Sequence, residues 1–168
     1  MGIDLRTMTP EEFDVFYRWS MENHIRELME EENLSRDAAI REAAEELTQM
    51  LPQGLATPHQ QLLTIEESDG GAVGFLWTLH EETEGRRQSF LCDFAIWEQC
   101  RRKGYATAAL ALMEQRAAAA GCEESVLFVA DRNTPATALY EECGYRLLRR
   151  LSYGAFMIKR LEREEKWI

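Results

Sequence analysis

The chain has 168 residues, of which 45% are hydrophobic and 29% are charged, a balance typical of a globular domain with its own core. Its formal net charge of -11 opposes binding to a nucleic-acid backbone but suits the attraction of a cationic, amine-bearing molecule. No apolar run approaches the roughly 20 residues that span a bilayer, and the first residues lack the pattern of a secretory signal. We therefore expect one domain over residues 1–168 that binds neither nucleic acid nor a membrane.

The cysteines give no sign of a metal site or a disulfide framework. There are four, with no Cys-x-x-Cys spacing and no clustered histidines beside them. We expect no metal, free thiols and a reducing, cytoplasmic compartment.

Residues 3–8 are expected to form a short strand, and a long helix follows. Thr9 has the position of a helix cap, Pro10 suits the first helical position, and Glu12 completes a capping box. The break at residues 33–34 ends this helix. A second helix, capped by Ser35, is expected to reach about residue 50 and to end in a loop with two prolines and a glycine.

The rest of the chain predicts strands over 61–66, 72–80, 89–97, 125–130, 145–151 and 153–161, and helices over 104–120 and 134–143. Residues 68–71 have the composition of a hairpin turn, polar residues 81–87 are expected to form the next turn, and residues 162–168 a charged tail. The order β-α-α-β-β-β-α-β-α-β-β predicts an α/β fold, a mixed sheet with helices on both faces.

A basic turn with a glycine joins the strand over 89–97 to the helix over 104–120. Arg101, Arg102 and Lys103 supply positive charge, and the free amides of the helix start favour a diphosphate. Gly104 lets the backbone approach such a ligand closely. The turn matches neither a Walker A motif nor a dinucleotide Gly-x-Gly-x-x-Gly. Read alone, it is more typical of a capped surface helix than of a ligand site.

A second motif makes the first one specific. The segment Arg101-x-x-Gly104-x-Ala106 resembles the Gln/Arg-x-x-Gly-x-Gly/Ala signature of the GNAT acetyltransferase superfamily. The segment Asn133-x-x-Ala136-x-x-Leu139-Tyr140-x-x-x-Gly144-Tyr145 resembles the second motif of that superfamily. Through the long helix pair, the loop over 51–58 and an acidic residue at Asp93, the chain is also similar to the poorly characterised bacterial YycN-type branch.

The resemblance implies a GNAT fold, with a mixed, mostly antiparallel sheet of about seven strands, splayed between the fourth and fifth, and about four helices on its two faces. It implies that acetyl-CoA is the co-substrate and that its acetyl group moves to a primary amine by direct attack on the thioester. The alternative is a non-catalytic module that senses acyl-CoA or binds a partner. The sequence leaves the acceptor amine unnamed and is compatible with a monomer or a homodimer.

The resemblance also implies roles for individual residues. The backbone of residues 94–96 would bind the pantetheine arm as an added strand, the turn would hold the pyrophosphate, and Tyr140 would protonate the leaving thiolate. The residues implied to bind the cofactor are Phe94, Ala95, Ile96, Arg101, Arg102, Lys103, Gly104, Tyr105, Ala106, Thr107, Asn133 and Tyr140.

The base that accepts the proton of the amine is sought among the carboxylates. Asp93 lies in an otherwise apolar strand, where burial can raise its pKa, although it can equally well fix a loop or a helix. Glu81 and Glu82 are alternatives that would act through water.

Three residues are candidates for binding the acceptor. Tyr17 and His24 share the apolar face of the first helix, and Trp77 lies on the strand over 72–80. Packing in the core is the alternative for Trp77, and a buried hydrogen bond is the alternative for His24.

Overall fold

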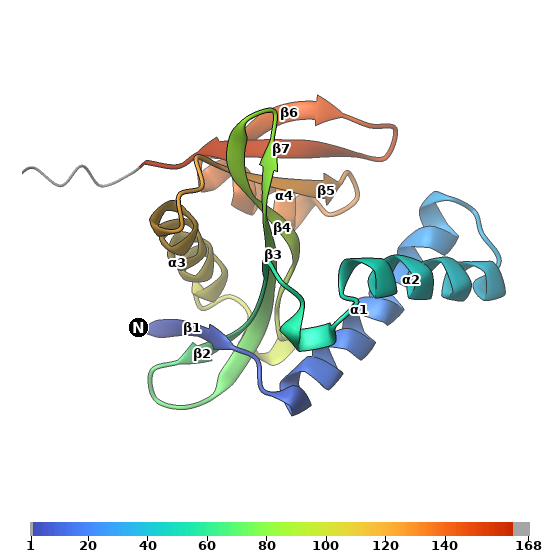
Figure 1. Cartoon of the computed structure of the whole chain (residues 1–168), viewed down its shortest axis with the longest axis horizontal. Helices are drawn as coiled ribbons and strands as arrows, with labels where there is room; N and C mark the ends of the chain where they lie inside the picture. Colours follow the sequence, from blue (N-terminus) through green and yellow to red (C-terminus); the bar gives the residue numbers. More distant parts are fainter. Residues whose placement is uncertain (1, 163–168) are drawn as a thin grey trace, which may run out of the picture.

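The computed structural model describes residues 2–162, in which strands and helices follow in the predicted order (Figure 1). The strands are β1 (Ile3–Thr7), β2 (Gln60–Glu67), β3 (Ala72–Thr83), β4 (Arg86–Ile96), β5 (Glu124–Ala130), β6 (Arg146–Arg150) and β7 (Gly154–Arg160). The α-helices are α1 (Pro10–Glu31), α2 (Arg36–Met50), α3 (Tyr105–Ala119) and α4 (Thr134–Glu142). The charged tail predicted over 162–168 lies outside the described residues except for Glu162.

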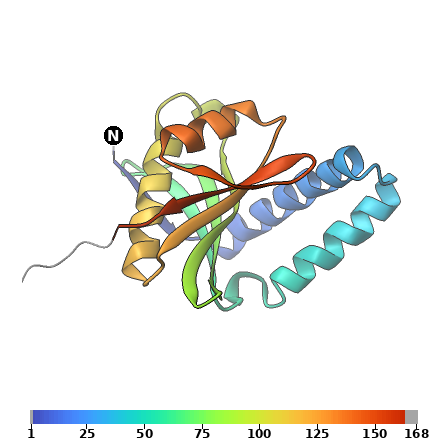
Figure 2. The same cartoon turned by 90° about the horizontal axis from the view of Figure 1, so that it is seen from above.

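All seven strands form one sheet, in the order β1-β2-β3-β4-β5-β7-β6. Neighbouring strands in the sheet are antiparallel, except for the parallel pair β4 and β5. Helices α1 and α2 lie on one face, and α3 lies on the other (Figures 1 and 2). Small side chains let α3 approach the sheet closely, since Ala109 and Ala117 are fully buried. The predicted mixed sheet with helices on both faces is confirmed.

Side-chain caps begin both N-terminal helices, as the sequence predicts. The Thr9 hydroxyl accepts from the amide of Glu12 at 3.2 Å, and the Glu12 carboxylate accepts from the amide of Thr9 at 2.9 Å. Ser35 caps α2 by accepting from the amide of Ala38. The inner face of α1 then buries Phe16, which is 1% exposed, against the sheet.

The predicted turn over residues 81–87 is wrong. Strand β3 continues to Thr83, β4 begins at Arg86, and the turn consists of Glu84 and Gly85, both with positive φ. Such a two-residue turn matches the twist of the strands it joins. The polar residues mislead because this end of the hairpin is exposed to solvent, so its strands need no apolar side chains.

An extra residue interrupts the pairing of β3 with β4. Trp77 pairs with Asp93 and Thr78 pairs with Leu91, which leaves Cys92 without a partner as a β-bulge. Side chains alternate along a strand, so the extra residue changes which face each one meets. Leu91 packs in the core on the α3 side, whereas Cys92 packs on the α1 side and Asp93 bonds to a residue of α1.

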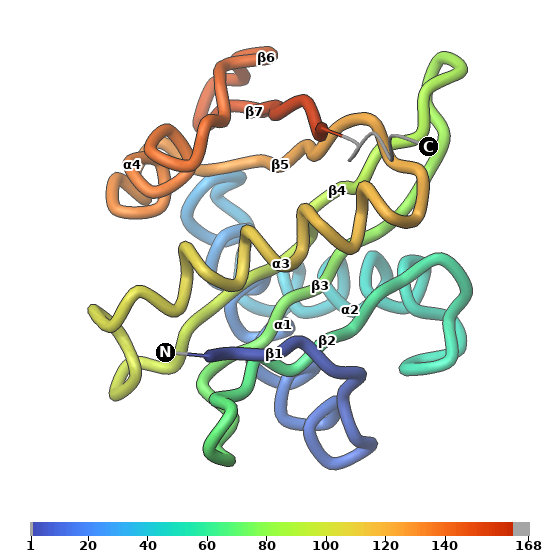
Figure 3. Tube along the Cα trace, turned by 90° about the vertical axis from the view of Figure 1, so that its left-hand side faces the viewer, coloured from blue at the N-terminus to red at the C-terminus, as the bar shows by residue number. Residues whose placement is uncertain are grey.

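Strands β4 and β5 part just beyond this bulge. They pair only from Gln88 to Leu91 on β4, although β4 continues to Ile96. Figure 3 shows the two strands side by side at one end and apart at the other. The predicted splay between the fourth and fifth strands is present, and it leaves the edge of β4 over residues 92–96 without a β5 partner.

We expect Gly74→Ala to lower the free energy of unfolding by about 1–3 kcal/mol, the usual cost of overpacking. A Cβ atom at Gly74 would lie 2.1 Å from the carbonyl oxygen of Ala95, on the strand that carries Asp93. Chemical denaturation measures the loss. Gly71→Ala is the matched control, because a Cβ atom there meets nothing within 4 Å. Equal stability of the two variants would show that the close approach is not required.

Candidate active site

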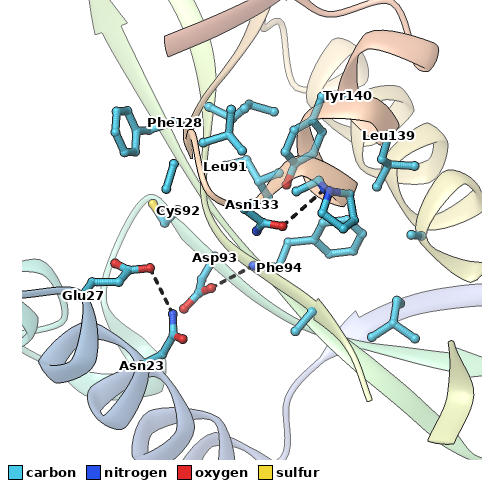
Figure 4. Close-up of a pocket in the computed structure, with 18 of the residues that line it drawn as sticks. Asn23, Glu27, Leu91, Cys92, Asp93, Phe94, Phe128, Asn133, Leu139 and Tyr140 are labelled. Carbon is cyan, nitrogen blue, oxygen red and sulfur yellow. Dashed lines mark hydrogen bonds between the residues drawn. The ribbon is translucent and has the colours of Figure 1, made fainter. Parts of the chain in front are cut away.

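A cavity of about 1040 Å³ opens where β4 and β5 part (Figure 4). Its walls come from the second half of α1, the end of β4, the start of α3, the end of β5 and α4. This volume is at the upper end of the range for small-molecule sites. The fold therefore provides room for a large ligand at the point where the sheet opens.

The edge of β4 forms one wall of this cavity. Phe94, Ala95 and Ile96, all predicted to bind the cofactor, line it. Because β5 has left the strand at this point, backbone groups on this edge are available to an extended ligand. The amide of Phe94 also donates to Oδ1 of Asp93 at 3.0 Å.

The basic turn and the start of α3 form the adjoining wall. Gly104 is the N-cap of α3 with φ 81°, and no side chain caps the helix there. The first hydrogen bond in the helix runs from the amide of Ala108 to the carbonyl of Gly104, so the preceding amides face the turn. Arg101 and Arg102 line the cavity, while exposed Lys103 does not. The other predicted residues that line it are Tyr105, Ala106 and Thr107.

Tyr140 of α4 faces the cavity on the other side of the β4 edge. It is 8% exposed, and its ring packs edge-on against Tyr145 with centroids 5.8 Å apart. Burial raises the pKa of Tyr140 to about 12, and the Asp93 carboxylate adds to the rise. The hydroxyl is therefore protonated at neutral pH. Asn133, which caps α4 by accepting from the amide of Ala136 at 3.3 Å, lines the same wall.

Asp93 lies between the β4 edge and α1. Its Oδ2 accepts from the hydroxyl of Ser20 at 2.8 Å, and its Oδ1 accepts from the amide of Phe94. Burial raises the pKa of Asp93 to about 6, although both hydrogen bonds oppose the rise. At neutral pH the group is mostly a carboxylate, but one that takes up a proton readily.

The α1 wall carries a cluster of charges around His24. Glu46 of α2 bonds to Nε2 of His24, and Oε2 of Glu27 lies 3.9 Å from Nδ1. Glu27 and Glu46 raise the pKa of His24 to about 9 against the opposing effect of burial. Asn23 donates to Glu27 at 3.3 Å, and both line the cavity (Figure 4). The imidazole is therefore a cation at neutral pH, held between two carboxylates.

A second ion-pair group joins two walls of the cavity. Arg132, in the loop between β5 and α4, pairs with Glu30 and Glu31 at the end of α1, and all three line the cavity. These side chains are partly exposed, so their pairs contribute little to stability. They do join the wall that carries Asn133 to the wall that carries His24.

Two predicted acceptor residues lie away from the cavity. Trp77 is 3% exposed, packs edge-on against Phe16 under α1, and donates its indole N–H to Gln60 at 2.6 Å. Tyr17 packs against Phe13 in the same cluster. The structure brings together Asp93, Tyr140, His24 and the turn, but not Tyr17 or Trp77. The sequence did not single out these cavity residues: Asn23, Glu27, Glu46, Phe128 and Arg132.

Glu81 and Glu82, the alternative bases, lie on β3 outside this cavity. Across residues 2–162 no cluster of three or more histidine, cysteine or acidic side chains suits a metal ion. Within the same residues, no helix has the length and apolar character needed to cross a membrane.

Residues 15–145 match the acetyltransferase (GNAT) family. The chain is 32% identical to the uncharacterized N-acetyltransferase YycN of Bacillus subtilis over 87% of this chain and 94% of YycN. The crystal structure of YycN aligns with a TM-score of 0.83 at 30% identity, over 89% of this chain and 96% of that one. A Vibrio cholerae spermidine N-acetyltransferase in complex with CoA and spermine has a TM-score of 0.67 at 19% identity, over 95% of both chains. These matches confirm the predicted fold and the resemblance to the YycN-type branch.

We expect Glu46→Gln to lower the pKa of His24, about 9 in the unchanged chain, by about one unit or more. Because the folded pKa lies above the ordinary 6.5, the stability that His24 adds is complete below pH 6.5 and is lost as pH rises through 9. Titration of the imidazole by NMR measures the midpoint.

Glu45→Gln is the matched control for this prediction. It removes the same charge from an exposed position on the same helix. A fall of equal size in both variants would mean that overall charge, rather than the contact between Glu46 and His24, sets the midpoint.

Proposed function

Because the chain belongs to the acetyltransferase (GNAT) family, we propose that it transfers an acetyl group from acetyl-CoA to a primary amine. One observation carries the proposal: a single cavity is lined by an unpaired strand edge, a basic helix start, Asp93 and Tyr140. The first two suit a pantetheine diphosphate, and the last two suit proton transfer at an amine and a thiolate.

The residues along the cavity fit acetyl-CoA as the co-substrate. The edge of β4 over residues 94–96 suits the amide groups of the pantetheine arm. The turn over residues 101–107 suits the pyrophosphate, because it combines arginines with the amides at the start of α3. Asn133 is expected to contact the cofactor from the α4 side.

In the proposed reaction the amine nitrogen attacks the thioester carbonyl carbon, the bond from that carbon to sulfur breaks, and an amide and the CoA thiol form. Asp93 takes the proton from the incoming ammonium, since its pKa of about 6 leaves it ionised at neutral pH. Tyr140 donates its proton to the departing sulfur, and the second proton that the nitrogen loses as the amide forms restores the Tyr140 hydroxyl. Backbone amides near Ala95 and Ile96 are proposed to stabilise the oxyanion.

Cys92 is not proposed as a nucleophile, although it lines the same cavity. Burial raises the pKa of its thiol, and the Asp93 carboxylate adds to the rise. The thiolate, which is the reactive form, is therefore scarce at neutral pH. We expect the acetyl group to pass straight from the thioester to the amine.

We further propose a cationic acceptor in the cytoplasm. Carboxylates of Glu27 and Glu46 face the cavity from α1 and α2, and the chain carries a net charge of -11. The Vibrio cholerae enzyme crystallised with spermine is a neighbour in fold whose ligand is also a cationic amine. The four cysteines are free, which supports a reducing compartment.

We expect purified protein to release CoA thiol from acetyl-CoA when a suitable amine is present, and Tyr140→Phe to lower kcat about 100-fold or more through loss of the general acid. Calorimetry should give acetyl-CoA affinities that differ far less than the kcat values, because phenylalanine keeps the ring that lines the cavity. If acetyl-CoA raises the Tm while no amine in a broad cationic panel releases thiol, the chain is a sensor and the proposed reaction is wrong.

We expect kcat/KM to rise with pH through about 6, because the active form of Asp93 is the carboxylate. Ser20→Ala removes a hydrogen bond that lowers the pKa of Asp93, so the rise should move to higher pH. Ser20→Thr keeps the hydroxyl and should restore the profile. The nearby charges of Glu27 and His24 are the same in all three proteins. Profiles that coincide for all three would remove Asp93 from the role of base.

A further inference from the structure

Four aromatic rings form a continuous group on the strands beside the cavity. Phe128 lies edge-on to Phe156 and to Tyr153, with centroids 5.2 and 5.4 Å apart, and Phe90 lies 6.4 Å from Phe156. Phe90, Phe128 and Tyr153 line the cavity, and none of these three rings is buried in a core cluster. We call these four residues the aromatic wall. Its residues come from β4, β5 and β7, and from Tyr153 directly before β7.

Glycine and arginine hold the aromatic wall in place. A Cβ atom at Gly154 would lie 2.4 Å from the ring of Phe128 and 2.6 Å from the carbonyl oxygen of Val129, so only glycine lets this ring rest on the backbone of β7. The guanidinium of Arg149 lies 5.2 Å from the centroid of Phe156. Phe128 is therefore packed from behind while it stays half-exposed toward the cavity.

Phe128, the residue of the aromatic wall that Figure 4 labels, lies across Asp93 from Tyr140. In Figure 4, Phe128 and Glu27 lie to one side of Asp93, whereas Asn133 and Tyr140 lie to the other. The side with Tyr140 adjoins the strand edge and turn that suit acetyl-CoA. The remaining volume is thus bounded by rings on the strands and by Asn23 and Glu27 on α1.

The chemistry of these two surfaces selects a kind of amine. A compact polar amine leaves the rings in contact with water, whereas an apolar arm covers them and gains about fourfold in affinity for each buried methylene. The carboxylates and ring faces both attract the ammonium group. Resting on the proposed function, we infer that the acceptor is an amphipathic primary amine whose apolar arm lies on the aromatic wall beside Phe128, with its amine at Asp93.

Binding of a homologous series tests this inference. Kd is measured by calorimetry for the n-alkylamines from propylamine to hexylamine, and for amino alcohols of matching length, on the protein saturated with CoA. We expect Kd to fall about fourfold for each methylene in the alkylamines, and to be higher for the amino alcohol of each length because its terminal hydroxyl loses hydrogen bonds to water on the rings. Phe128→Ala should flatten the dependence on length, and Phe128→Leu should retain part of it because an apolar surface remains.

Leu148→Ala is the control, because this leucine is 53% exposed on β6 and lies outside the cavity. It should leave the dependence on length unchanged, and equal Tm values would show that the Phe128 variants fold. No binding of any amine, a Kd independent of arm length, or an unchanged slope in Phe128→Ala would overturn the inference. The readout is binding alone, so the proposed acetyl transfer is judged separately by thiol release.

Discussion

The cavity depends on two structural features that lie within a few residues of each other on β4. The bulge at Cys92 turns Asp93 toward α1 while Leu91 stays in the core on the α3 side. The pairing with β5 ends at Leu91, so the strand beyond it has a free edge. A bulge increases the local twist of a strand, which helps to carry β4 away from β5. The same short segment thus orients a carboxylate and opens the space that the carboxylate faces.

Charge is distributed along this cavity in a consistent way. On the β4 edge and α4, burial disfavours ionisation, and it raises the pKa of both Asp93 and Tyr140. On the α1 side, the carboxylates of Glu27 from α1 and Glu46 from α2 reverse that effect and keep His24 protonated. The turn before α3 adds arginines at the far end. A polyanionic cofactor and a cationic amine therefore meet surfaces of opposite sign at the two ends of one space.

Local signals predicted most of the elements, and long-range contacts account for what was missed. The capping box at Thr9 depends on residues three positions apart, so the sequence reveals it directly. The bond between Ser20 and Asp93 joins residues 73 positions apart, and no local pattern records it. Trp77 pairs with Asp93 across two strands, but α1 covers it, and a strand pattern cannot say which helix covers which side chain. In the sequence, Phe128 is one more apolar residue of a predicted buried strand. Only the structure shows that Gly154 packs behind its ring and that the ring is half-exposed toward the cavity.

The number of residues in β4 decides which face of the sheet each of its side chains meets. The shape of the cavity therefore depends on the presence of an extra residue at position 92 more than on the identity of that residue. Other small side chains can occupy the bulge. Deletion of residue 92, however, would turn the side chains on one side of the bulge to the opposite face of the sheet. The ring of Phe90 would then turn into the core and the buried Ser89 would turn out of it. A substitution in β4 keeps the register of the strand, whereas an insertion or deletion shifts it. New acceptor preferences are accordingly expected to arise by substitution of cavity residues, on α1, on α2 and in the aromatic wall, because substitutions leave the register of the sheet unchanged.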